Sequence, residues 1–243
     1  MLEIENLTKQ YGRTKAVDDL TLTTRPGEVV ALLGPNGAGK TTTIRCVVGL
    51  ASPTSGRITI DGHDTKRDAL KARAATGIVV DRAWFYPKVT ARELLRYVAS
   101  VRRQGDATER IEALLTRFRL AEHADTLTES YSHGMRQRLA FCAALLGDPQ
   151  LFIADEPMVG LDVQGHRDVK NLFRELADQG KTVIITTHTL AVAEEVADRI
   201  AVVNHGRLIA LGTMSDLRQQ AGRADGNLED IFLDLTEPHE AAA

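Results

Sequence analysis

Hydrophobic and polar positions alternate near the N-terminus and then give way to continuous apolar runs. Residues 2–11 and 16–24 alternate apolar and polar side chains, as half-buried antiparallel strands do. Residues 29–33 are all apolar and stop at a glycine, which is typical of a strand buried on both faces. Two further strands are predicted at 56–62 and 76–80. The pattern therefore predicts an antiparallel sheet beside a more deeply buried one.

Helical periodicity dominates the middle of the chain. A first helix is predicted from Lys40 to about Gly49. Three later stretches place apolar residues at i, i+3 and i+4, and they cover residues 91–103, 107–120 and 134–147. These three stretches predict a helical subdomain at about residues 91–149.

The rest of the chain returns to alternating strands and helices. Buried strands are predicted at 150–154 and 181–187 with a helix at 168–179 between them, then a hairpin at 199–212 and a helix at 227–236. We therefore predict an α/β fold with a mainly parallel sheet, an antiparallel β subdomain and an inserted α-helical subdomain. All 243 residues form one predicted domain, with residues 1–90 and 150–243 as its α/β core.

Composition and charge argue against a nucleic-acid groove, a disulfide and a membrane span. The net charge is −3, so no basic excess indicates a nucleic-acid groove. The two cysteines, Cys46 and Cys142, lie in apolar helical contexts and are expected to be buried thiols rather than a disulfide. The start is charged within three residues, unlike a signal peptide, and no apolar run approaches the ~20 residues of a membrane span. We expect a soluble protein that meets a membrane only through a partner.

A glycine-rich segment follows the buried strand at 29–33. Residues 34–41 match the phosphate-binding pattern G-x-x-x-x-G-K-[ST] between a strand and a helix, and all eight positions are in register, which disfavours a mere glycine turn. Glycines let backbone N–H groups converge on phosphate oxygens, and a helix N-terminus adds a favourable dipole. Lys40 would bridge the β- and γ-phosphates, and Thr41 would ligate Mg²⁺. The predicted nucleotide-binding residues here are Gly34, Pro35, Asn36, Gly37, Ala38, Gly39, Lys40, Thr41 and Thr42.

Two adjacent acids end the buried strand at 150–154. Because neighbouring residues on a strand point to opposite sides, Asp155 and Glu156 are expected to have different roles. Asp155 suits the Mg²⁺ side, as in other phosphate-loop enzymes. Glu156 would face the γ-phosphate and orient or deprotonate the attacking water. The alternative is that the two acids are merely solvent-exposed residues at the end of the strand. The phosphate loop upstream disfavours this alternative.

The segment upstream of these acids, YSHGMRQRLA, resembles the LSGGQ signature of ATP-binding cassette (ABC) proteins. Ser132, Gly134 and Arg138 keep the pattern, whereas the first glycine of the signature is replaced by His133. The resemblance implies that Ser132 and Gly134 grip the γ-phosphate of ATP bound to a second subunit. Ser132 is equally a candidate helix N-cap, and the two roles are compatible.

The resemblance covers nearly the whole chain and implies further roles. Tyr11 matches the aromatic residue that stacks on adenine, although a surface or core tyrosine is the alternative. Residues 160–162 look like the loop that joins the two active sites of a dimer. His188 follows the strand at 181–187, where the family places a catalytic histidine beside the γ-phosphate.

Asp81 is a departure from the family pattern. The family usually has glutamine after the strand that corresponds to residues 76–80, beside the metal. Both side chains offer an oxygen ligand, but aspartate is shorter and charged. Asp81 is thus a candidate Mg²⁺ ligand together with Thr41 and Asp155, and a solvated acid at the end of the strand is the alternative.

An aromatic cluster, Trp84, Phe85 and Tyr86, follows in the region where the family meets its membrane subunit. Packing of the helical subdomain against the core is the alternative role. The compact length, the signature and the ending at 227–236 look most like the separate ATP-binding subunits of exporters for drugs, antibiotics or polysaccharides.

The resemblance implies an ATPase that uses ATP and Mg²⁺ and forms a dimer, with a homodimer favoured over a related partner. A separate polytopic membrane subunit would place it in the cytoplasm, peripherally on the inner face of the cell membrane, with no nucleic-acid partner. The alternative is a soluble ABC ATPase acting on DNA or ribosomes. Against it, only a short helical insertion lies between the nucleotide motifs, and only one cassette is present.

Overall fold

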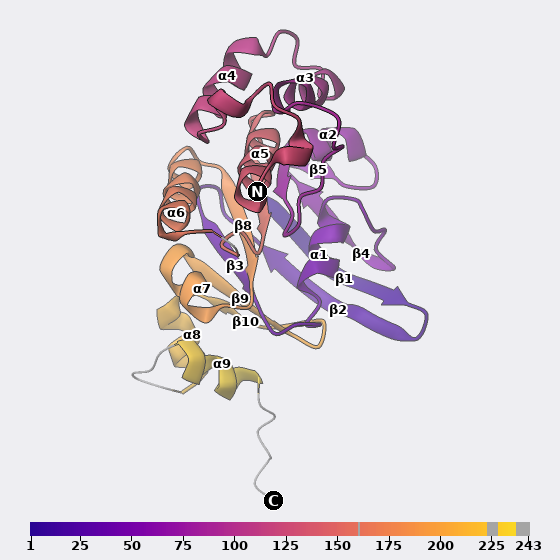
Figure 1. Cartoon of the computed structure of the whole chain (residues 1–243). Coiled ribbons are helices and arrows are strands. Elements are labelled where there is room, and N and C mark those ends of the chain that lie inside the picture. The colour runs from indigo at the N-terminus through magenta and orange to yellow at the C-terminus, as the bar shows by residue number, and fades with distance from the viewer. Residues whose placement is uncertain (160, 223–227, 237–243) are drawn as a thin grey trace, which may run out of the picture.

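A six-stranded sheet forms the centre of the computed structural model, which describes residues 1–159, 161–222 and 228–236 (Figure 1). The strand order is β10-β9-β3-β8-β7-β6. Five of these strands run parallel, and β10 pairs antiparallel with β9 at one edge. The strands are β3 (Val29–Leu33), β6 (Thr76–Val79), β7 (Leu151–Asp155), β8 (Thr182–Thr187), β9 (Arg199–Asn204) and β10 (Arg207–Gly212).

A second, antiparallel sheet has the order β2-β1-β4-β5. It contains β1 (Leu2–Tyr11), β2 (Thr14–Thr23), β4 (Ser55–Ile60) and β5 (His63–Asp64). Together, the mainly parallel sheet and the antiparallel sheet confirm the predicted α/β fold class.

Two hydrophobic cores cover the two faces of the parallel sheet. Val29, Ala31 and Leu33 of β3 pack into one core with helical residues, whereas Val30 and Leu32 pack into the other with the antiparallel sheet. Alternate residues of a strand point to opposite faces, so a strand between two cores must be apolar throughout. This explains the continuous apolar run, and it fixes the end of β3 where the glycine-rich segment begins.

The helices lie on both faces of the parallel sheet and at one end of the molecule. In Figure 1, α3 and α4 lie at the top, and α5 runs between them and the sheet. Thr90 and Glu93 form a capping box at the start of α3, which fixes where that helix begins. The helices are α1 (Lys40–Val47), α2 (Ala69–Ala74), α3 (Ala91–Val101), α4 (Thr108–Arg117), α5 (His133–Leu145), α6 (Val163–Asp178), α7 (Leu190–Val196), α8 (Met214–Gln220) and α9 (Leu228–Thr236), with short 3₁₀ turns η1 (Ala121–His123) and η2 (Thr128–Ser130).

Most predicted elements are present, with shifted ends. The hairpin across Asn204 and His205 is confirmed as β9 and β10, and the buried, free state of Cys46 and Cys142 is confirmed. Helices α2, α7 and α8 were not predicted, because each spans only six or seven residues. The predicted C-terminal helix is α9, whose first predicted residue, Asn227, lies outside the described residues.

Asp64 organises the turn that leads from β5 toward α2. Its carboxylate accepts hydrogen bonds from the backbone N–H groups of Lys66 and Arg67 at 2.9 and 3.0 Å, and from Arg57 Nε at 2.8 Å. These bonds, the one from Arg67 foremost, lower the pKa of Asp64 to about 2 from an ordinary value of 3.8. The ionised carboxylate therefore stabilises the fold above pH 3.8, and this contribution is lost as the pH falls toward 2.

Replacement of Asp64 by asparagine is expected to lower the free energy of unfolding by about 1–3 kcal/mol at neutral pH, because a charged acceptor of three hydrogen bonds is removed. Urea unfolding at stepwise lower pH should show the gap to wild type narrowing below about pH 4. Asp61→Asn, at an exposed neighbour, is the control and should stay close to wild type. A gap for Asp64→Asn that does not change with pH would contradict this account.

Candidate nucleotide-binding and hydrolysis site

Crowding by backbone explains two of the three glycines in the segment between β3 and α1. A Cβ atom on Gly34 would lie 2.2 Å from the carbonyl oxygen of Val203, and one on Gly39 would lie 2.5 Å from that of Ala16. Gly39 also has φ 105°, in the left-handed region, and forms the N-cap of α1. The segment is thus pressed against β9 and β2, which leaves its other side facing a cavity.

Lys40 begins α1 and is almost fully buried, with 7% of its surface exposed. Its ammonium donates hydrogen bonds to the carbonyl oxygens of Gly34 at 2.5 Å and Pro35 at 3.2 Å. Burial lowers the pKa of Lys40, whereas the negative charges of Glu156 and Asp155 act in the opposite direction. The Lys40 ammonium is therefore held by two carbonyl oxygens of the glycine-rich segment, near the carboxylates of Asp155 and Glu156.

Asp155 and Glu156 face different partners. Asp155 ends β7 and accepts a hydrogen bond from the Thr186 hydroxyl of β8. Glu156 lies beyond the strand with φ 50°, an uncommon conformation for a residue with a side chain. Its Oε1 lies 2.7 Å from Nδ1 of His188, which follows β8. The left-handed backbone of Glu156 thus directs its side chain toward His188.

One cavity of about 800 Å³ collects most of the predicted site residues. Asp81 and Thr41 are both exposed and line this cavity with Asp155. The predicted residues that line it are Pro35, Asn36, Gly37, Ala38, Gly39, Lys40, Thr41, Thr42, Asp81, Asp155, Glu156 and His188. The remaining predicted residue of the glycine-rich segment, Gly34, contributes its carbonyl to Lys40.

Besides Gly34, three predicted residues lie outside the lining of this cavity. Tyr11 ends β1, is 48% exposed and lies under the Lys9 ammonium, 4.7 Å from its ring centroid. Ser132 is the N-cap of α5, where its hydroxyl accepts a hydrogen bond from the backbone N–H of Met135 at 3.2 Å. Among the described residues, nothing beyond the chain neighbours and the backbone of α5 itself lies within 4 Å of where a Cβ atom on Gly134 would be. Ser132 therefore caps α5, which is the structural role that the sequence also allowed.

Several residues of the site were not predicted. His133 lines the cavity together with Ala16, Arg82 and Val159. His133 stood out in the sequence only as a departure from the signature, and Ala16 carries no chemical signal. Asp162, in the predicted dimer loop, caps α6 by accepting from the Gly165 N–H at 2.7 Å. Gly160 of the same loop lies outside the described residues.

The aromatic cluster after Asp81 divides into exposed and packed members. Trp84 and Tyr86 are 78% and 60% exposed, respectively. Phe85 is half-buried and packs against the core shared with the helices, and Thr128 donates a hydrogen bond to the Tyr86 carbonyl at 2.8 Å. The packing role therefore falls to Phe85, whereas the other two rings remain on the surface.

The chain is similar in sequence to known proteins. A family model described as "ABC transporter" matches residues 17–159. The Linearmycin resistance ATP-binding protein LnrL of Bacillus subtilis (strain 168) is 38% identical over 91% of this chain and 72% of that protein. The Daunorubicin resistance ATP-binding protein DrrA3 of Streptomyces coeruleorubidus is 39% identical over 96% of this chain and 73% of that protein.

Solved structures show the same fold. One described as the ATP-binding subunit of an ABC transporter superimposes with a TM-score of 0.92 at 32% identity, over 98% of this chain and all of that chain. A dimeric ATP-binding cassette in a post-hydrolysis state with ADP and Pi gives a TM-score of 0.80 at 27% identity, over 88% of this chain and 99% of that chain.

The fold, the glycine-rich segment and these matches define an ATP-binding cassette ATPase. The chain belongs to the ABC transporter family, in which it is an ATP-binding and ATP-hydrolysing subunit. Within the described residues, every helix is too short or too polar to cross a membrane.

Replacement of Gly34 by alanine should lower ATP affinity about ten-fold or more, because the new Cβ would clash with the backbone of β9 and displace the segment. Titration calorimetry with ATP measures this effect. Gly105→Ala is the control, since Gly105 has φ 64° with open space around it and lies outside the cavity. It should lower the melting temperature with little change in ATP affinity. Equal ATP affinities for the wild type and Gly34→Ala would contradict the interpretation.

Proposed function

We propose that this chain is the ATPase subunit that drives an exporter through a separate polytopic membrane subunit. The observation that carries the hydrolytic part is the convergence of Lys40, Asp155, Glu156 and His188 on one cavity. Export is supported by relatives named for drug resistance, and by a Nod factor export ATP-binding protein from Paraburkholderia xenovorans that is 40% identical over 89% of this chain. The names of these relatives support export as the direction of transport and leave the cargo of this chain open.

The glycine-rich segment is assigned to the triphosphate. Backbone N–H groups of residues 36–42, which include the start of α1, would donate to phosphate oxygens. Lys40 would exchange its carbonyl partners for the β- and γ-phosphates. Tyr11 would stack on adenine, because its ring is exposed at the end of β1.

Mg²⁺ fits the oxygen donors on this side of the cavity. Thr41, Asp155 and Asp81 offer a hydroxyl and two carboxylates, which are hard ligands of the kind that Mg²⁺ prefers. The described residues contain no cluster of three or more His, Cys, Asp or Glu side chains that could hold a metal ion alone. Phosphate and water oxygens would therefore complete the coordination, and the ion would neutralise charge on the phosphates.

Glu156 is assigned as the general base. The 2.7 Å contact with His188 holds its carboxylate, and its left-handed backbone separates it from Asp155. A water beside the γ-phosphate would give its proton to Glu156 as it attacks phosphorus. His188 would orient Glu156 and reach the γ-phosphate from the end of β8.

A second copy of the chain is assigned to complete the site. Ser132 and Gly134 lie outside the lining of the cavity in their own chain. Glycine in a helix is less stable than alanine by about 1 kcal/mol. Within the part of the chain that the structure describes, no neighbouring element crowds Gly134. Close approach of the partner's nucleotide would account for this glycine. The dimeric cassette structure supports this arrangement, and we propose a homodimer.

The membrane subunit is assigned to the surface around Trp84 and Tyr86, which are exposed beside Asp81. The protein would then lie peripherally on the cytoplasmic face of the cell membrane, without a nucleic-acid partner. We also propose the division into one domain with an α/β core, residues 1–90 and 150–243, and a helical subdomain at about 91–149. Copurification with a polytopic membrane protein, rather than with ribosomes or DNA, tests this function against a soluble ABC ATPase.

Glu156→Gln should slow ATP hydrolysis by about 10²–10⁴-fold, the usual contribution of a general base, while ATP stays bound. Phosphate release measures the rate, and size-exclusion chromatography with Mg-ATP should show a persistent dimer. Glu122→Gln, at an exposed residue of η1, is the control and should hydrolyse ATP like wild type. A Glu156→Gln protein that remains monomeric at high protein and saturating ATP would argue against the assignment.

Asp81→Gln should lower the apparent affinity for Mg²⁺ and improve nucleotide binding without metal. A carboxylate binds the ion more strongly than an amide does, but it repels the triphosphate when the ion is missing. Asp81→Ala should share the second effect. A Mg²⁺ titration of hydrolysis at fixed ATP measures the first. Superimposable curves for wild type and both variants would mean that Asp81 is a solvated acid.

A further inference from the structure

The end of β1 carries a cation against an aromatic ring. The Lys9 ammonium lies 4.7 Å from the ring centroid of Tyr11. This is within the roughly 6 Å over which the face of an aromatic ring attracts a cation. Tyr11 is 48% exposed, and among the described residues no second ring or cation packs on it. One face of the ring is thus covered by the ammonium, and the other face is open.

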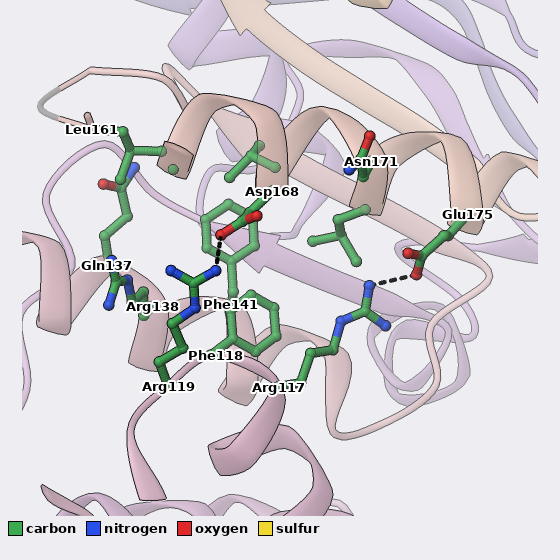
Figure 2. Close-up of a pocket in the computed structure, with 13 residues that line it drawn as sticks. Arg117, Phe118, Arg119, Gln137, Arg138, Phe141, Leu161, Asp168, Asn171 and Glu175 are labelled. Carbon is green, nitrogen blue, oxygen red and sulfur yellow. Dashed lines mark hydrogen bonds and ion pairs between the residues drawn. The ribbon is translucent and has the colours of Figure 1, made fainter. Parts of the chain in front are cut away.

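Phe118 offers a contrast, because its ring is already occupied. In the cavity between α4, α5 and α6, the Arg117 guanidinium lies 5.9 Å from the centroid of Phe118, which also stacks on Phe141. Figure 2 shows that Arg117 is paired with Glu175 as well. Phe118 therefore has both a cation and a ring against it, whereas the Tyr11 ring has room for one more layer.

The Lys9 ammonium is anchored by the loop that follows α1. Its Nζ donates a hydrogen bond to the Ser52 carbonyl at 2.8 Å. That loop is tied to β1 on both sides of this lysine. The Thr54 N–H donates to the Thr8 carbonyl at 2.8 Å, and the Gln10 N–H donates to Thr54 Oγ1 at 3.0 Å. Lys9 forms no ion pair within the described part of the chain, so no carboxylate neutralises its charge.

Strand pairing places Tyr11 at the margin of the nucleotide cavity. Tyr11 pairs with Thr14 of β2, two residues before Ala16. Ala16 lines the nucleotide cavity, and its carbonyl oxygen lies 2.5 Å from the position of a Cβ atom on Gly39 of the glycine-rich segment. A base attached to a triphosphate in that cavity would therefore lie near the Tyr11 ring.

A cation on one face of a ring favours stacking on the other face. The faces of aromatic rings are electron-rich, so two rings laid face to face repel unless they are offset. An ammonium draws electron density toward its own face and so reduces this repulsion on the far face. Because the Ser52 carbonyl anchors the ammonium, the ring is also held in place before the base arrives, which lowers the ordering cost of binding.

We propose that Lys9 is a positioning residue for the base of ATP. Lys9 holds and polarises the Tyr11 ring from one face, and adenine stacks on the open face. This role rests on the proposed function, in which Tyr11 stacks on adenine. Lys9 then contributes to ATP affinity through the base and not through the phosphates.

The test compares ATP with inorganic tripolyphosphate, which has the phosphates but lacks the base. Binding to the full chain is measured by titration calorimetry without Mg²⁺, so that ATP is not hydrolysed, at about 0.15 M salt, where exposed charges more than about 8 Å apart are screened. Lys9→Met should weaken ATP binding about 2–5-fold, the usual strength of a cation–ring contact at an exposed site, and leave tripolyphosphate binding unchanged. Lys9→Arg should bind ATP like wild type, because a guanidinium also stacks on aromatic faces.

Further variants isolate the contact with the ring. In the double variant of Lys9→Met and Tyr11→Ala, the lysine change should add nothing to the loss caused by Tyr11→Ala, because the ring through which Lys9 acts is missing. Lys71→Met is the matched control, since Lys71 is an exposed lysine of α2 outside the nucleotide cavity, and it should bind both ligands like wild type. Melting temperatures check folding, and if Lys9→Met is not folded, Lys9→Gln carries the test with the same expected loss.

Three results would overturn the proposal. Equal losses of ATP and tripolyphosphate affinity in Lys9→Met would make Lys9 a charge that attracts phosphate. A loss from Lys9→Met that persists in the Tyr11→Ala background would separate Lys9 from the ring. Wild-type ATP affinity in Lys9→Met, together with weakened binding in Tyr11→Ala, would overturn the role of Lys9 alone. If Tyr11→Ala itself binds ATP like wild type, the stacking role in the proposed function fails, and the role of Lys9 fails with it.

Discussion

The structure depends on a buried ammonium held beside two carboxylates. Lys40 begins α1 after β3, whereas Asp155 and Glu156 stand at the end of β7, with β8 between the two strands. Carboxyl ends of parallel strands share one edge of a sheet, so this order brings charges distant in sequence into one cavity. Burial lowers the pKa of Lys40, and the two acids oppose that shift. The adjacency of these strands is therefore what makes the site possible.

Two features of the site cost stability in the isolated chain, and bound molecules account for both in the proposed function. Glu156 holds a left-handed backbone, and a residue with a side chain adopts that conformation only when its surroundings enforce it. Gly134 weakens the start of α5, although no neighbour among the described residues requires a glycine there. In the proposed function, a γ-phosphate lies before Glu156 in the same chain, and a partner's nucleotide approaches Gly134. In the proposed function, the strained backbone of Glu156 and the glycine at position 134 therefore both serve ATP binding or hydrolysis.

Much of the fold and of the cavity could be predicted from the sequence, because the signals are local. The apolar run of β3 is required because that strand packs into two cores. Gly34, which follows it, is required because the Val203 carbonyl leaves no room for a side chain. Helices α2, α7 and α8 escaped prediction because one or two turns give too few periodic positions. The cavity between α4, α5 and α6 was also hidden, since the residues that line it, such as Phe118 and Leu172, come together only after helices distant in sequence have packed. The role of each site residue stays a prediction from the sequence.

The central claim is that two chains share each ATP site, and a mixing experiment tests it most directly. Lys40→Ala removes the phosphate-binding ammonium, and Ser132→Arg blocks the surface offered to the partner. Each variant alone should hydrolyse almost no ATP. In a mixed dimer, one of the two sites combines an intact Lys40 with an intact Ser132. The account predicts that an equal mixture recovers about a quarter of wild-type ATPase activity. A mixture no more active than the separate variants would contradict it.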